Sequence, residues 1–225
     1  MRDRRDINNG EIMEIIIRKI TIEDAKVFAA LAKQTFYDTF TGTCTEKDME
    51  AYLEEYYNLP KVEAELSTPD AYNYFAEVNG VPVGYIRFME DYSDYPFKEK
   101  RKALELKRLY ILKEFQGKAI AQELMNVYFH HANEYQYELA WLSVWEHNYK
   151  AQHFYKKYGF EYSGHQHPFP IGGTPQTDLW FWKFLQSNLQ QILLFKIRLV
   201  KYFFNFPNAW LTSAVRNFLG KIASF

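Results

Sequence analysis

The chain has 225 residues, a formal net charge of −1, 48% hydrophobic residues and 24% charged residues, which is the composition of a folded globular protein. This composition excludes an intrinsically disordered chain, a collagen-like repeat and a disulfide scaffold. The single cysteine, Cys44, allows no intrachain disulfide and suits a reducing compartment, so we predict a cytoplasmic location and no Cys-rich metal site.

The charges are distributed unevenly along the chain. Residues 179–225 contain six Lys and Arg residues and no Asp or Glu, so residues 1–178 carry a net charge of −7 within the total of −1. An acidic body argues against a nucleic-acid partner and permits a cationic one. No run of about 18 uncharged apolar residues is present, so we predict no transmembrane segment.

The N-terminal part of the chain predicts a strand followed by two helices. The isoleucines of Glu14–Ile20 predict the strand. Thr21 with Asp24, and Thr45 with Asp48, form Thr-x-x-Asp capping patterns, each of which begins a helix.

The middle of the chain predicts a β-hairpin and a further strand. Lys61–Leu66 is compatible with a short third helix. Asn79-Gly80 is a strong signal for a two-residue turn, and it joins predicted strands at Tyr72–Val78 and Val81–Met89. A polar loop then leads to a strand at Ala103–Leu112.

The C-terminal part alternates helices and strands. Apolar periodicity predicts a helix over residues 118–133, and Leu139–Trp145 predicts a strand buried on both faces. Asn148 can cap a further helix that ends at Gly159, where a left-handed residue is needed. The last predicted strands are Phe160–Gly164 and Leu179–Leu185.

These elements predict one mixed α/β domain over residues 13–185. Residues 1–12 are polar and are expected to form a disordered leader. Residues 186–225 form a basic, apolar extension. Three roles remain open for it: packing on the domain, contact with an anionic membrane surface, or covering a homodimer interface.

A short loop between the strand at 103–112 and the next helix suits an anion. Gly117 and Ala119 are small residues where the helix opens. The helix's first N–H groups and positive dipole end favour a phosphate, and Lys118 adds a positive charge. Taken alone, this signal is weak, because many ordinary strand–helix junctions look alike.

Two motifs give the chain a resemblance to a known family. Gln116-Gly-Lys-Ala-Ile-Ala121 resembles the Gln/Arg-x-x-Gly-x-Gly/Ala loop of the GNAT superfamily of acetyl-CoA-dependent N-acetyltransferases. Asn148-Tyr-Lys-Ala-Gln-His-Phe-Tyr-Lys-Lys-Tyr-Gly-Phe160 is similar to that superfamily's second signature. Within the superfamily, the chain is most similar to PaiA-like bacterial spermine/spermidine acetyltransferases, through both motif regions and the end that includes Gln176-Thr177-Asp178.

The resemblance covers roughly residues 14–185 and implies a GNAT-like mixed, mostly antiparallel sheet flanked by helices. It implies acetyl-CoA as cosubstrate, no metal, and direct acetyl transfer to a primary amine. The expected acceptor is a small-molecule amine, a polyamine such as spermidine or spermine. The alternatives are a protein N-terminus, an amino acid or an antibiotic as acceptor, or a coenzyme-binding regulatory protein with weak activity.

The resemblance also assigns roles to individual residues. Tyr155 matches the proton donor to the departing thiolate, although its place on an apolar stripe also suits a core tyrosine. Glu105 matches a general base found in some members, although an exposed strand glutamate is the alternative. Leu109, Tyr110 and Ile111 are expected to pair with the pantetheine chain, with the Ile111 N–H polarising the thioester carbonyl. The loop expected to hold the pyrophosphate consists of Gln116, Gly117, Lys118, Ala119, Ile120 and Ala121. Asn148 is a further expected coenzyme contact, although helix capping alone would explain it.

One position departs from the family pattern. The family loop usually has glycine where this chain has Ala119. If position 119 requires a positive φ, alanine costs about 1 kcal/mol or more. We therefore expect coenzyme binding to be weakened but retained.

The acceptor is expected to meet the first two helices. Residues 36–57 contain six Asp and Glu residues against one Lys, together with several aromatic residues. Carboxylates beside aromatic faces suit a polyamine. The predicted acceptor contacts are Tyr37, Asp38, Glu50 and Glu54; a solvated amphipathic helix is the alternative.

Overall fold

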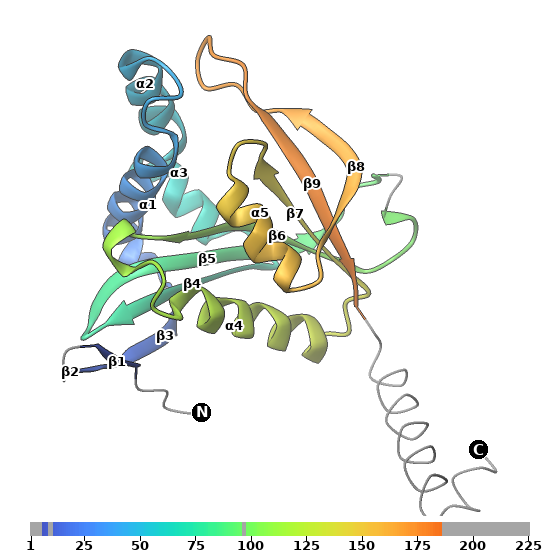
Figure 1. Ribbon diagram of the computed structural model, residues 1–225, viewed down its shortest axis with the longest axis horizontal. Helices are drawn as coiled ribbons and strands as arrows, with labels where there is room; N and C mark the ends of the chain where they lie inside the picture. The colour runs from blue at the N-terminus through green and yellow to red at the C-terminus, as the bar shows by residue number, and fades with distance from the viewer. Residues whose placement is uncertain (1–5, 9–10, 96–97, 186–225) are drawn as a thin grey trace, which may run out of the picture. The chain divides into compact units, whose positions relative to one another are not determined.

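The computed structural model describes residues 6–8, 11–95 and 98–185 (Figure 1). The extension predicted over residues 186–225, with its three alternatives, lies outside the described residues. The segment expected to be a disordered leader contains two short strands, β1 (Asp6–Asn8) and β2 (Glu11–Met13), which pair antiparallel.

A seven-stranded sheet forms the centre of the domain (Figure 1). Every neighbouring pair is antiparallel except β6 and β7, which run parallel. The predicted mixed, mostly antiparallel sheet is therefore confirmed. In spatial order the strands are β3 (Ile15–Lys19), β4 (Ala71–Val78), β5 (Val81–Asp91), β6 (Ala103–Ile111), β7 (Leu139–Trp145), β9 (Thr177–Phe184) and β8 (Glu161–Pro168).

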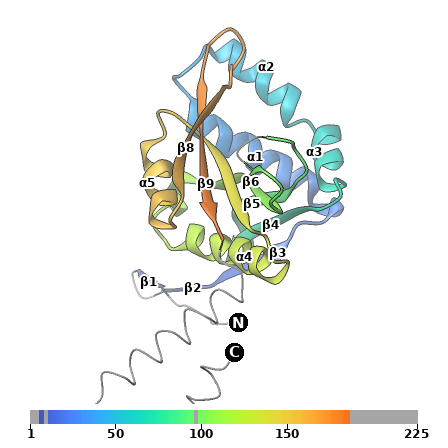
Figure 2. The same cartoon turned by 90° about the vertical axis from the view of Figure 1, so that its right-hand side faces the viewer.

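Helices cover both faces of this sheet (Figures 1 and 2). Tyr85 of β5 packs edge-on against Phe28 at 4.9 Å, whereas Phe88, three positions later, packs against Tyr128 at 5.3 Å. Because side chains alternate between faces along a strand, these contacts place α1 and α4 on opposite sides. The helices are α1 (Ala25–Phe40), α2 (Glu46–Tyr56), α3 (Leu59–Leu66), α4 (Ile120–Glu134) and α5 (Tyr149–Lys157).

Local signals in the sequence explain many of the element boundaries. The Thr45 hydroxyl accepts from the Asp48 N–H at 3.1 Å and caps α2. Asn79 and Gly80 have φ values of 51° and 78°, as a type I′ hairpin turn requires. The strand predicted to end at Gly164 instead continues to Pro168 because residues 166–168 pair with β9.

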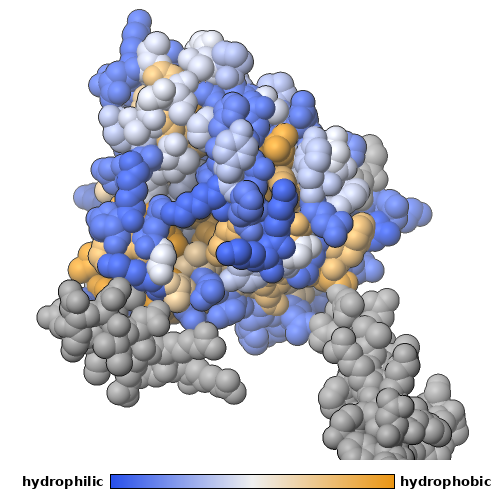
Figure 3. Space-filling view, in the orientation of Figure 1, coloured by the Kyte–Doolittle hydropathy of each residue, from blue (hydrophilic) through white to orange (hydrophobic). Residues whose placement is uncertain are grey.

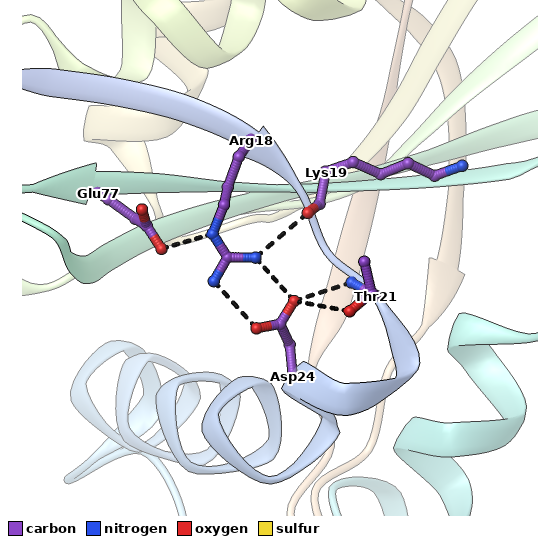
Figure 4. Close-up of polar contacts among 5 residues, drawn as sticks. All are labelled: Arg18, Lys19, Thr21, Asp24 and Glu77. Carbon is purple, nitrogen blue, oxygen red and sulfur yellow. Dashed lines mark hydrogen bonds and ion pairs between the residues drawn. The ribbon is translucent and has the colours of Figure 1, made fainter.

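A cluster of polar side chains joins β3 to the start of α1 (Figure 4). The Arg18 guanidinium donates to Glu77 Oε1 at 2.7 Å and to both Asp24 oxygens at 2.7 and 2.9 Å. Asp24 also accepts from the Thr21 N–H at 2.9 Å, which completes the predicted capping box. The hydrogen bonds from Arg18 lower the pKa of the Asp24 carboxyl to about 2.

The pairing of β6 with β7 stops halfway along both strands. Residues 103–106 pair with residues 139–142, whereas β6 continues to Ile111 beside β5 alone and β7 continues to Trp145 beside β9 alone. The pairing of β5 with β6 shifts register between Arg87 and Phe88, close to the point where β6 separates from β7. The sheet therefore opens between the carboxyl ends of β6 and β7.

The described surface is largely polar on the face drawn in Figure 3, where hydrophobic areas lie between hydrophilic side chains. Among the described residues, no helix combines the length and apolar character needed to cross a bilayer.

Candidate active site

A cavity of about 970 Å³ lies where β6 and β7 separate. Its walls come from both sides of the sheet: α1 and α2 contribute Phe36, Phe40 and Tyr52, whereas α5 contributes Ala151 and Tyr155. The opening in the sheet thus connects a space beside α1 and α2 to a space beside α5.

One face of the sheet carries most of the polar lining, and we call it the acceptor face. Glu105 lies opposite Trp141, and Asp178 lies opposite Trp145, in neighbouring strands. Directly opposite residues share a face, as do residues two apart on one strand, so these four side chains lie on the same side. The acceptor face lining the cavity consists of Arg87, Met89, Glu105, Trp141, Ser143, Trp145, Asp178 and Trp180.

The open edge of β6 offers unpaired backbone groups. The Leu112 N–H donates to the Val83 oxygen at 2.9 Å. Because hydrogen-bonding direction alternates along an antiparallel pair, the N–H groups of Ile111 and Leu109 point away from β5 towards the opening. Leu109 and Tyr110 line the cavity, and Ile111 lies just beyond its lining. An extended pantetheine chain could pair with this edge.

The loop after β6 has the backbone geometry of an anion site. Gly117 has a φ of 81° and Ala119 a φ of 60°, immediately before the first residue of α4. A Cβ added at Gly117 would meet nothing within 4 Å, so the loop has room beside it. The first N–H groups of α4 have no partner within the helix and are available to an anion. Residues 116–121 therefore fit a pyrophosphate, although they lie outside the cavity lining itself.

Two side chains brace this loop. Gln116 Nε2 donates to the Ile111 oxygen at 3.1 Å, and Lys150 Nζ donates to Gln116 Oε1 at 2.5 Å. The exposed Gln116 side chain thus links the end of β6 to α5. Lys118 lies with its ammonium 5.0 Å from the Phe115 ring centroid.

Ala119 occupies a conformation that favours glycine. Its φ of 60° and ψ of −2° are left-handed, and its carbonyl accepts from the N–H groups of Gln122 and Glu123. The condition stated from the sequence, that position 119 has a positive φ, is therefore met. Ile120 is buried beneath the loop and Ala121 is half-buried.

Tyr155 and Asn148 meet the cavity from the α5 side. Tyr155 is 8% exposed, and burial raises the pKa of its phenol well above the usual range, so the hydroxyl keeps its proton at neutral pH. Asn148 Oδ1 accepts from the Ala151 N–H at 3.1 Å and caps α5, while the residue also lines the cavity. Capping and contact with the cavity therefore coexist at Asn148.

Glu105 is buried rather than exposed. Its residue exposure is 8%, and its carboxylate pairs with Lys107 Nζ at 2.6 Å. Burial raises the pKa of the Glu105 carboxyl, and Lys107 opposes that rise. The exposed-glutamate alternative from the sequence is therefore wrong.

Asp178 is a cavity residue to which the sequence assigned no role. It is near the start of β9, opposite both Trp145 of β7 and His167 of β8. Burial raises the pKa of its carboxyl to about 6, and a hydrogen bond with Ser143 partly offsets that rise. Its position in the Gln176-Thr177-Asp178 stretch was the available signal, since that stretch contributed to the family resemblance.

The four predicted acceptor residues lie outside the cavity lining. Asp38 accepts from Gln34 Nε2 at 3.0 Å, and the exposed Glu54 pairs with Lys33 at 3.1 Å. Glu50 is exposed, and Tyr37 packs at the edge of the core. The structure therefore does not bring Tyr37, Asp38, Glu50 or Glu54 into this lining, and their contact with the acceptor stays a prediction.

Helical periodicity explains why the acidic residues of α2 are absent from the lining. Tyr52 stacks on Phe36 at 4.7 Å, so the aromatic stripes of α1 and α2 face each other and the cavity. Glu50 and Glu54 lie two positions from Tyr52 on either side, and two positions turn a side chain about 200° around a helix. The acidic residues consequently point away from the stripe that meets the cavity.

Sequence comparisons identify the family. The model of the acetyltransferase (GNAT) family matches residues 33–160. An uncharacterised N-acetyltransferase from the pepI 3′ region of Lactobacillus delbrueckii subsp. lactis is 32% identical over 163 residues, covering 72% of this chain and 92% of that protein. The chain belongs to the acetyltransferase (GNAT) family. It is an N-acetyltransferase that uses acetyl-CoA as cosubstrate.

Solved structures share the fold. The PaiA N-acetyltransferase of Thermoplasma acidophilum, in complex with coenzyme A, is 24% identical with a TM-score of 0.63, covering 77% of this chain and all of that one. A GCN5-related N-acetyltransferase of Rhodopseudomonas palustris is 19% identical with a TM-score of 0.60, covering 78% and 99%. Arabidopsis thaliana NAA60, in complex with a bisubstrate analogue, is 15% identical with a TM-score of 0.56, covering 77% and 99%.

Among the described residues, no group of three or more His, Cys, Asp or Glu side chains is arranged to hold a metal ion.

Proposed function

We propose that this acetyltransferase modifies the primary amine of a small cationic acceptor, with a polyamine such as spermidine as the first candidate. The observation that carries the proposal is the charge of the cavity. Its lining has five carboxylates, Glu65, Glu90, Asp91, Glu105 and Asp178, against three cations, Arg87, Lys107 and Arg108. Lys102 and Lys98, outside the lining, lie 3.9 Å from Glu90 and Asp91, so Asp178 is the carboxylate of this set that remains to attract an ammonium group.

Aromatic rings strengthen this selection for a cation. Tyr52 and Tyr57 from the region of α2 lie on the same cavity as Trp141 and Trp180 of the sheet. Ring faces attract an ammonium by about 0.5–2 kcal/mol, more so when water is excluded. The aromatic side chains lining the cavity are Phe36, Phe40, Tyr52, Tyr57, Tyr92, Tyr95, Tyr110, Trp141, Trp145, Tyr155, Phe169 and Trp180.

The chain's own residues supply binding and proton transfer. Bound acetyl-CoA supplies the acetyl thioester. The loop 116–121 holds the pyrophosphate, and the open edge of β6 aligns the pantetheine chain with the Ile111 N–H available to an oxygen. Tyr155, protonated at neutral pH, donates a proton to the departing thiolate. A carboxylate on the acceptor face removes a proton from the arriving ammonium; the family resemblance favours Glu105 for that role.

A second reading retains the fold and coenzyme site but gives a regulatory protein with weak activity. The left-handed conformation of Ala119 is the observation that favours it, because strain in the loop weakens coenzyme binding.

One assay separates these readings. The protein is incubated with acetyl-CoA and a panel of spermidine, spermine, amino acids, aminoglycosides and short peptides, and free thiol is followed. Turnover with the polyamines supports the proposal, whereas turnover with peptides alone overturns it. Tight acetyl-CoA binding without turnover on any amine supports the regulatory reading.

A further inference from the structure

Among the cavity carboxylates, Asp178 differs from the others in having no cationic partner. Glu65 pairs with Arg108 at 2.7 Å and Glu105 with Lys107 at 2.6 Å. Glu90 and Asp91 each have a lysine ammonium at 3.9 Å, from Lys102 and Lys98 respectively. For Asp178, the described residues provide no ion pair, and the Ser143 side chain is the neighbour that lowers the pKa of its carboxyl.

A half-buried carboxylate without a counterion gains most when a cation arrives. Asp178 is the second residue of β9 and lines the cavity. Its neighbour Ser143 is on β7, the strand at the edge of the opening. Ser143 is the first residue of β7 beyond the pairing with β6. The strand that carries Asp178 is therefore one strand spacing, about 5 Å between backbones, from β7, which borders the opening in which the thioester is expected.

Glu105 is placed differently along the sheet. It pairs with Trp141 within the closed part of the β6–β7 ladder, two residues before Ser143, which corresponds to about 7 Å along the strand. Its carboxylate is already neutralised by Lys107 at 2.6 Å. Glu105 therefore suits a role in holding charge near the acceptor better than a role in taking up a proton.

We propose that Asp178, positioned by Ser143, is the general base that deprotonates the acceptor ammonium. This inference rests on the proposed function. The N–H bond of the ammonium breaks, an O–H bond forms on the Asp178 carboxylate, and the electron pair left on nitrogen becomes the nucleophile. The complete transfer converts ammonium and thioester into amide and thiol and releases one proton, which leaves Asp178 for solvent.

The surroundings of Asp178 are consistent with proton uptake near neutral pH. Burial raises the pKa of its carboxyl to about 6, close to the value that favours a base at physiological pH. The titratable groups facing it are His167 on β8, Tyr52 on α2 and Tyr110 on β6, with Glu105 and Lys107 further along the cavity. Burial and Lys107 lower the pKa of His167, which favours the neutral ring beside the carboxyl.

The test compares Asp178→Asn with Glu105→Gln, the same change at a carboxylate that has a counterion. Using the amine that the parent turns over best, we expect Asp178→Asn to lower kcat about 100-fold or more at pH 7. Acetyl-CoA affinity, measured by calorimetry, stays within about twofold. Glu105→Gln raises the acceptor KM more than it lowers kcat.

The pH profile distinguishes a base from a structural residue. The parent's kcat/KM for the amine falls below an apparent pKa near 6. In Asp178→Asn this limb disappears, and kcat/KM rises about tenfold per pH unit towards the pKa of the free amine, roughly 10. Because Ser143 lowers the pKa of Asp178, Ser143→Ala moves the limb to higher pH.

Three results would overturn the proposal. An Asp178→Asn enzyme within threefold of the parent, with the limb retained, removes Asp178 from the reaction while leaving the proposed function intact. If Asp178→Asn does not fold, an unmoved limb in Ser143→Ala overturns the proposal instead. A parent that acetylates no amine overturns the proposed function and this inference together.

Discussion

Replacing Ala119 by glycine tests whether the coenzyme loop is strained. Ala119 has a φ of 60°, and an L-residue in the left-handed region costs about 1–2 kcal/mol. Glycine removes that cost but loses about 0.4–1 kcal/mol through the greater freedom of the unfolded chain. The net expectation for Ala119→Gly is a stabilisation of about 0.5–1 kcal/mol, or a Tm increase of about 1–4 °C.

The same change should tighten coenzyme binding, because the loop can relax around the pyrophosphate. If binding gains the same 0.5–1 kcal/mol, Kd for acetyl-CoA falls about two- to fivefold. Isothermal calorimetry measures Kd, and scanning calorimetry measures Tm.

Gln136→Gly is the matched control. Gln136 has a φ of 56° just beyond the opposite end of α4 and is exposed. It should raise Tm by a similar amount and leave the acetyl-CoA affinity unchanged. An affinity no tighter in Ala119→Gly than in the parent, or equally tightened by Gln136→Gly, refutes the reasoning.

Three further predictions follow from named contacts. Tyr155→Phe should lower kcat about 100-fold with a much smaller change in KM, because we propose the phenol as the proton donor; steady-state kinetics with an unchanged kcat would remove that role. Tyr52→Ala should raise the acceptor KM about two- to fivefold through lost cation–π attraction. Glu54→Gln, at an exposed position paired with Lys33, should leave this KM unchanged. A larger rise in KM for Glu54→Gln than for Tyr52→Ala would favour the acidic face of α2 as the acceptor site. Asp24→Asn should lower the free energy of unfolding by roughly 1–2 kcal/mol at pH 7, because Arg18 holds the pKa of Asp24 at about 2, below the ordinary 3.8. This contribution to stability is complete above about pH 4 and is lost as the pH falls to about 2. Urea unfolding that shows an equal loss of stability at pH 2 and pH 7 would contradict the prediction.

Local chemistry made much of this fold predictable. Thr45 and Asp48 mark the start of α2 through a hydrogen bond between near neighbours, and Asn79-Gly80 specifies its turn through two positive φ values. Such signals depend on a few consecutive residues. The end of β8 was predicted too early because its last residues, His167 and Pro168, show no apolar alternation. They belong to the strand because they pair with β9.

The site was predictable only where a motif recorded it. The loop at 116–121 and Tyr155 were chosen from the family signatures and Glu105 from the wider resemblance, and the structure brings Tyr155 and Glu105 to one cavity from different elements. Asp178 could not be chosen in the same way, because its importance depends on the register between β7 and β9. The acidic residues of α2 were expected to meet the acceptor because charge was counted along the sequence, without regard to the helix face that lies at the cavity.

Acetylation of a small amine is the central claim, and product analysis tests it most directly. The protein is incubated with acetyl-CoA and spermidine, and the reaction is examined by mass spectrometry, with Tyr155→Phe as the matched control. We predict N-acetylspermidine formed in equal amount to free coenzyme A, and strongly reduced formation in the variant. Thiol release without acetylated amine, or equal product from the parent and Tyr155→Phe, would contradict this account.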